Sequence, residues 1–221
     1  MSFLATALLA MPVVAAERET CDQTGFSVEA DTPVVTELVC DVVDRALPRL
    51  QACHLDIRAP VHIVVSDNLA GVPDGCIALF VCEQNEIRIG TVDSVSRTLL
   101  PESLFSSIEK NVFFESILVH EMAHAFFEQN ACDRAKCAEN HEYVAHAMQM
   151  AWLPEKERAR IVAAYPVEHP IDPLRLNAFI AAFAPDRYAA TVWQHFSLAE
   201  NGCEIVRRLV AGEQSLQLMP R

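Results

Sequence analysis

The sequence predicts an α+β fold, with a small antiparallel sheet in the N-terminal half and a mainly helical region after it. Short apolar runs of strand length lie between residues 61 and 90, whereas apolar residues recur at helical spacing from Pro101 onward. No internal repeat, low-complexity tract or linker divides the 221 residues, and 52% of them are hydrophobic. We therefore expect one domain with a substantial core.

The first sixteen residues, MSFLATALLAMPVVAA, contain no charged side chain and precede the charged segment ERETCDQ. The apolar run has the length of a signal-peptide core, and Ala15 and Ala16 supply small residues for cleavage. We expect residues 1–16 to be a signal peptide and residues 17–221 to form the mature, periplasmic or secreted domain. The alternative is a buried N-terminal strand or helix. A membrane anchor is not expected, because a span needs about 20 apolar residues.

The next elements follow in order along the chain. Residues 31–52 predict a helix that begins near Asp31 or Thr32 and is interrupted around Pro48. Three strands are expected at 61–65, 77–81 and 86–90, the last two joined as an antiparallel hairpin by residues 83–85. Helices then cover 101–129, as one or two segments, and continue at 139–153, 154–165, 173–184, 186–200 and 202–212.

Eight cysteines, an even number, indicate an oxidising compartment and up to four disulfides. Cys132 and Cys137 share a polar loop and could close locally. Cys76 and Cys82 should not pair, because the ends of a continuous strand of that length lie about 20 Å apart. The formal net charge of −13 argues against nucleic acid and anionic membranes as partners, since both are polyanions.

An H-E-x-x-H motif, His120-Glu121-Met122-Ala123-His124, lies in the longest predicted helical segment. Residues four apart share one helix face, so both imidazoles can reach a single Zn²⁺ ion, one per chain. Glu121 projects from the same turn, where it can act as the general base that takes a proton from the attacking water. The motif therefore predicts a zinc-dependent hydrolase.

Apolar residues surround this motif on nearly every side, from Phe113 and Phe114 before it to Phe126 and Phe127 after it. Such a helix belongs in a core, where two imidazoles and a carboxylate are costly to bury unless something pairs with them. A metal ion would do so. The alternative is a pair of core histidines hydrogen-bonded to neighbours, with Glu121 in a salt bridge.

The third ligand is expected on the following helix, which offers Glu139, His141, Glu142 and His146. Here the sequence resembles the gluzincin metallopeptidases, in which a ligand Glu follows H-E-x-x-H by seventeen or more residues; Glu142 follows His124 after seventeen. The resemblance covers about residues 105–153. It implies a zincin-like fold, zinc held by His120, His124 and Glu142, and hydrolysis of a peptide or protein substrate. A second interpretation is membership of an uncharacterised family of short exported bacterial proteins with this layout.

Several alternatives remain open at this stage. His146 or Glu139 could replace Glu142 as third ligand. Some gluzincins carry an acid four residues after the ligand Glu, where it orients a ligand imidazole; this sequence has His146 at that position. That orienting group would then be Glu139, Glu115 or a backbone carbonyl. Candidate donors to the developing oxyanion are Tyr143, Tyr165, Tyr188, His146, His169 and His195. The rival function is a non-catalytic exported protein whose zinc is closed off by a fourth side chain such as His146.

Overall fold

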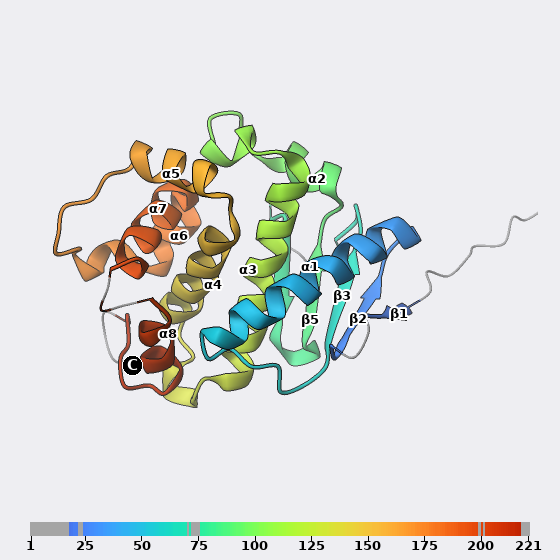
Figure 1. Cartoon of the computed structure of the whole chain (residues 1–221), viewed down its shortest axis with the longest axis horizontal. Helices are drawn as coiled ribbons and strands as arrows, with labels where there is room; N and C mark the ends of the chain where they lie inside the picture. The colour runs from blue at the N-terminus through green and yellow to red at the C-terminus, as the bar shows by residue number, and fades with distance from the viewer. Residues whose placement is uncertain are drawn as a thin grey trace, which may run out of the picture.

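A five-stranded sheet forms one side of the molecule (Figure 1). The structure is a computed structural model that describes residues 18–21, 24–69, 71, 76–198, 200 and 202–217, and the expected signal peptide lies outside them. The strands run in the order β1-β2-β3-β5-β4. Their bounds are β1 Arg18–Thr20, β2 Phe26–Glu29, β3 Val61–Val65, β4 Ala78–Val81 and β5 Glu86–Ile89. With the helices that follow it, this sheet confirms the α+β class.

The sheet is mixed, so the expectation of an antiparallel sheet is wrong for its centre. Strands β2, β3 and β5 are parallel to one another, and only the edge pairs β1–β2 and β4–β5 are antiparallel. The reason is that α1 (Pro33–Ala52) connects β2 to β3 as a helical crossover, which returns the chain in the same direction. The predicted hairpin is confirmed, with Asn85 in the left-handed region at φ 49°.

Strand β4 forms the free edge of the sheet nearest the third helix. It pairs only with β5, in the register Phe80 opposite Ile87. Packing between β4 and α3 (Lys110–Asn130) brings this edge against the helix that carries the H-E-x-x-H motif. The short helix α2 (Val92–Thr98), which the sequence did not predict, leads from the sheet toward α3.

Helix α1 begins where expected, with the Thr32 hydroxyl accepting a hydrogen bond from the Val35 backbone N–H. Pro48 does not interrupt it, contrary to the expectation, and α1 continues to Ala52. Pro48 lies on the exposed face of α1, where water can satisfy the Asp44 carbonyl that loses its helical donor. Helix α1 packs against β2 and α3.

Helix α3 lies between the sheet and the C-terminal helices (Figure 1). It contacts β4, β5 and α1 on one side and α4 (Ala138–Trp152) on the other. This packing on two sides explains why apolar residues occur on nearly every side of α3. Phe113, Phe114, Phe126 and Phe127 are each at most 2% exposed. The expectation of a core helix is therefore confirmed, and the polar residues Ser116 and Glu121 are buried with it.

The remaining helices pack outward from α4. Helix α7 (Pro185–Phe196) contacts α4, and it also contacts α5 (Glu155–Ala164), α6 (Ala178–Phe183) and α8 (Gly202–Val210). Short 3₁₀ turns occupy Leu104–Ser107, Asp133–Ala135 and Pro173–Leu176. None of the helices in the described ranges is long and apolar enough to cross a membrane.

Two disulfides are present, Cys21–Cys40 and Cys53–Cys203. The first ties the segment before β2 to α1, and the second joins the end of α1 to α8 across a sequence separation of 150 residues. Cys132 and Cys137 are free thiols, so the expected local bond is wrong. Cys137 is buried at the start of α4, whereas Cys132 is half-buried and its N–H donates to the Val210 carbonyl.

Candidate metal centre

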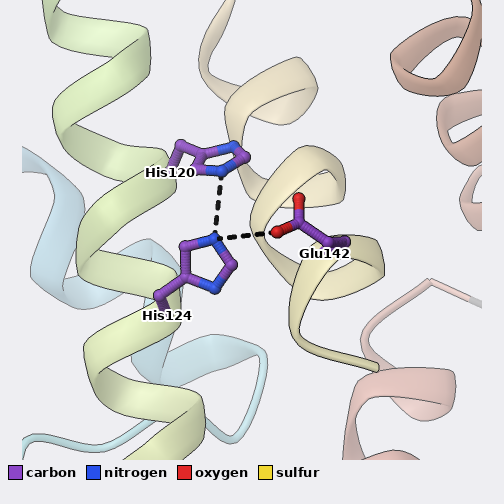
Figure 2. Close-up of side chains that lie close together, drawn as sticks. All are labelled: His120, His124 and Glu142. Carbon is purple, nitrogen blue, oxygen red and sulfur yellow. Dashed lines mark hydrogen bonds and ion pairs between the residues drawn. The ribbon is translucent and has the colours of Figure 1, made fainter. Parts of the chain in front are cut away.

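Two imidazoles of α3 face each other one helical turn apart. Nε2 of His120 and Nε2 of His124 lie 3.1 Å from each other, with their ring planes nearly perpendicular. Both side chains point away from the sheet and toward α4 (Figure 2). The i, i+4 spacing therefore places two potential ligand atoms at one point, as the motif predicts.

Glu142 approaches the same point from α4 (Figure 2). Its Oε1 atom lies 3.9 Å from Nε2 of His124, and one ligand atom from each of His120, His124 and Glu142 lies within 4.8 Å of the other two. The structure thus brings together the three residues that the sequence singled out. The group does not include His146.

Gln149, which the sequence analysis missed, fixes the orientation of His120. Its Oε1 atom lies 3.1 Å from Nδ1 of His120, and the glutamine is 2% exposed. Because an amide oxygen only accepts, Nδ1 carries the proton and Nε2 of the neutral ring keeps its lone pair. A signal existed: Glu142, His146 and Gln149 are spaced by four and three residues, which puts them on one face of α4.

Glu115 does not serve as this orienting group, contrary to one of the expectations. Its carboxylate accepts a hydrogen bond from Nε1 of Trp152 at 3.2 Å and pairs with Arg45 at 3.1 Å. Glu115 precedes the motif on α3 and is directed at α1 and the end of α4. Glu115 therefore connects α3 to α1 and α4, and Gln149 is the residue that orients His120.

Burial keeps both facing imidazoles neutral. It lowers the pKa of His120 to about 4, although the hydrogen bond to Gln149 works in the opposite direction. Burial, and after it the neighbouring His120, His141 and His146 rings, hold the pKa of His124 well below its ordinary value. Neutral imidazoles present lone pairs, which is the form that binds a metal.

Glu121 lies beside the imidazoles and is 6% exposed. Burial raises its pKa to about 8; the charge of Glu142 raises it further, and a hydrogen bond from the Phe80 backbone N–H of β4 opposes both effects. Burial likewise raises the pKa of Glu142 to about 7. Two carboxyl groups with elevated pKa values therefore flank two neutral imidazoles, and a cation between them would favour the ionised acids.

His146 and His141 occupy different surroundings. His146 lies next to His120, with ring centroids 4.7 Å apart, and its Nε2 atom is 3.6 Å from Oε2 of Glu142. Its Nδ1 atom is buried without a hydrogen-bond partner in the described part of the chain. His141 stacks on His124 and pairs with Glu128 at 3.3 Å, so it is packed outside the three-residue group.

A cleft of about 650 Å³ opens over one side of the centre. His120, Glu121, His146 and Gln149 line it, so His120 and the acid can be reached from solvent, whereas His124 and Glu142 do not line it. Of the other candidate oxyanion donors, Tyr165 also lines the cleft. The Tyr143 hydroxyl is instead paired with Nδ1 of His195 at 2.8 Å, and Tyr188 donates to the Leu176 carbonyl.

The donor set fits a zinc ion. Two imidazole nitrogens and one carboxylate oxygen are a known catalytic zinc set, and tetrahedral geometry at zinc separates ligand atoms by about 3.3–3.5 Å. The observed separations of 3.1 Å and 3.9 Å bracket that value. Two Nε2 lone pairs facing each other in a buried site are unfavourable unless a cation or a proton lies between them.

The chain belongs to a family of unknown function, DUF6639, whose model matches residues 26–219. The matched range begins at β2 and includes His120, Glu121, His124, Glu142 and Gln149. No curated protein and no solved structure shows significant similarity to the chain.

Proposed function

We propose that this member of the DUF6639 family is a zinc-dependent peptidase with a zincin-like fold and with Glu121 as its general base. One observation carries the proposal. His120, His124 and Glu142 converge from two adjacent helices, beside the buried acid Glu121, and His120 and Glu121 line an open cleft. The likeness of this motif and its spacing to the gluzincin pattern supports the same reading.

His120, His124 and Glu142 would hold the zinc ion, one per chain. Zinc, when bound, supplies a Lewis acid that polarises the substrate carbonyl and lowers the pKa of water. Three protein ligands leave one position open, which is the arrangement of catalytic zinc sites. The cleft approaches the candidate centre from the side of His120, since His120 and Glu121 line it and His124 and Glu142 do not.

Glu121 moves the proton in this scheme. Its carboxylate takes a proton from the attacking water and gives it to the amine that leaves when the amide bond breaks. Burial raises the pKa of Glu121 to about 8 in the metal-free protein, and a zinc cation beside it would lower that pKa toward neutrality, where the group accepts and releases a proton at similar cost. The hydrogen bond from the Phe80 N–H holds the carboxyl group at the side of the centre next to β4.

A peptide is the favoured substrate because of β4. This strand is the free edge of the sheet, and its Phe80 N–H points away from β5 toward Glu121. The Phe80 N–H donates its hydrogen bond to Glu121, and the rest of a free strand edge offers main-chain hydrogen bonds to an extended peptide. Ile77 and Ala78, at the start of β4, line the same cleft. The edge strand and the centre are thus placed to act on one extended chain.

The rival is a non-catalytic protein in which His146 closes the zinc site. The unpartnered Nδ1 atom of His146 and its place beside Glu142 favour this candidate. The exclusion of His146 from the three-residue group favours an open site. The two differ in a measurable property: an open site binds added hydroxamate or exchanges water, whereas a closed tetrahedral site does neither.

We place the mature protein outside the cytoplasm, periplasmic or secreted. The two disulfides support this placement, because such bonds persist in oxidising compartments. The apolar residues 1–16 fit export by a signal peptide.

The test measures zinc content and turnover of a peptide library in three variants. His124→Ala should abolish zinc binding. Glu121→Gln should keep the zinc ion and lose turnover by about 10²- to 10⁴-fold. Glu115→Gln is the matched control on the same helix and should keep both, since Glu115 contacts Arg45 and Trp152. Full turnover in Glu121→Gln would remove Glu121 as the base, and full zinc occupancy in His124→Ala would refute the ligand assignment.

A further inference from the structure

The cleft over the candidate centre has a polar floor and apolar walls. Its polar floor consists of groups from α3 and α4, and its walls come from β4, the segment after α2, α3 and α6. The large apolar side chains among the lining residues are Ile77, Leu99, Leu100, Phe105, Phe113, Ile117 and Phe183. A concave apolar surface with a few convergent polar groups is the usual form of a ligand site.

Two of these apolar side chains are largely exposed to solvent, and a bound ligand would cover them. Leu100, on the segment after α2, is 63% exposed, and Phe183, at the end of α6, is 75% exposed; both line the cleft. Folding ordinarily buries side chains of this size. Their exposure beside a group of potential metal ligands indicates a surface that is covered during binding.

The charges around the cleft do not favour an acidic ligand. Besides Glu121, the lining acids are Glu102 and Asp186, and Arg187 is the one lysine or arginine among the described lining residues. Asp186 is 8% exposed and accepts hydrogen bonds from Ser103 and from the Leu104 N–H, so it belongs to the wall. The chain as a whole carries a formal charge of −13. A carboxylate-rich substrate would meet net repulsion.

We infer that the cleft binds a peptide residue with a large apolar side chain, next to the bond that is cleaved. This inference rests on the proposed function, because it places the substrate relative to the zinc ion. It narrows the substrate class to peptides with a bulky apolar residue and sets aside peptides rich in carboxylates. Burial of one such side chain should improve binding about 10- to 100-fold.

The test titrates the zinc-loaded full chain with three hydroxamates, which share a metal-binding group and differ in the rest. The probes are acetohydroxamate, 3-phenylpropanohydroxamate and succinic monohydroxamate, with binding followed by calorimetry. The phenyl probe should bind about 10- to 100-fold more tightly than acetohydroxamate, and the succinyl probe no more tightly. Equal binding of all three, or tightest binding of the succinyl probe, would overturn the inference and leave the zinc centre intact.

A pair of leucine variants locates the effect in the cleft. Leu100→Asp should reduce the affinity of the phenyl probe at least several-fold without changing that of acetohydroxamate. Leu174→Asp is the matched control, because Leu174 is 57% exposed and does not line the cleft. Equal losses in both variants would place the apolar contact elsewhere and overturn the inference. Failure of the wild type to bind zinc, or to bind any hydroxamate, would instead overturn the proposed function and this inference with it.

Discussion

Replacement of Gln149 by leucine should weaken zinc binding although Gln149 is not one of the three proposed ligands. The side chain is 2% exposed, and its Oε1 atom accepts the hydrogen bond from Nδ1 of His120 at 3.1 Å. In the metal-free variant, His120 can shift its proton to Nε2 and donate it to Nε2 of His124, also at 3.1 Å. Zinc needs the Nε2 lone pair, so binding forces the proton back to an Nδ1 atom that has lost its acceptor.

The size of the effect follows from this tautomer argument. A buried donor without a partner costs about 1–3 kcal/mol, and here the cost falls on the zinc-bound state. Since each 1.4 kcal/mol is a factor of ten, zinc affinity should fall about 5- to 150-fold. Competition with a chromophoric chelator at neutral pH measures this directly, and thermal unfolding of the same samples separates it from a loss of stability.

Two further glutamine variants make the experiment decisive. Gln149→Glu keeps an acceptor opposite His120 and should bind zinc at least as tightly as the wild type. Gln194→Leu removes a glutamine of α7 that accepts from the Val167 N–H and donates to the Tyr165 carbonyl, so it should lower stability and leave zinc affinity unchanged. Wild-type affinity in Gln149→Leu would show that the hydrogen bond does not orient His120.

Two other predictions concern stability. Replacing both cysteines of Cys53–Cys203 by serine should lower the free energy of unfolding by about 5 kcal/mol, and the same change at Cys21–Cys40 should lower it by about 3 kcal/mol. The difference arises because the sequence separations are 150 and 19 residues, and a longer loop loses more entropy when it is closed. Equal losses in urea denaturation would contradict the loop-entropy explanation. In the metal-free protein, Glu121 should contribute a loss of stability of about 2 kcal/mol as pH rises from 6.5 to 8, because the folded state keeps its proton up to a pKa of about 8 whereas the ordinary value is 4.5. Buried histidines such as His120 contribute in the opposite direction near pH 6.5, because the unfolded state releases their protons there while the folded state keeps them neutral, and this contribution is common to the wild type and Glu121→Gln. Glu121→Gln should decline less over the same range, and an equal decline would show that Glu121 is not the group responsible.

The parts of the fold that the sequence predicts are those whose signal is local. The H-E-x-x-H helix is apolar on nearly every side because it packs between a sheet and a helix, and its end near Gln129 follows from that pattern, whereas the expected helical start at residue 101 is wrong because α3 begins at Lys110. The hairpin of β4 and β5 follows from two adjacent apolar runs. Strand β2 has only four residues, Phe26–Glu29, and its parallel pairing with β3 depends on where α1 returns the chain. No local pattern reports that pairing, and the same holds for the partners of the cysteines.

The candidate centre is also predictable only in part. The sequence shows which residues share one face of α4, but it does not show which residues of α3 that face contacts. Spacings of four and three residues put Glu142, His146 and Gln149 on one face, and the sequence leaves open which of them meets which histidine. Helix α4 packs against α3 after the connection 131–137 and runs back along it (Figure 1). Moving from His124 to His120 therefore corresponds to moving forward along α4, from Glu142 beside His124 to Gln149 beside His120. A slip of one turn between the helices would bring His146 opposite His124 and move Glu142 away, so the register of α4 on α3 assigns ligand and orienting residue.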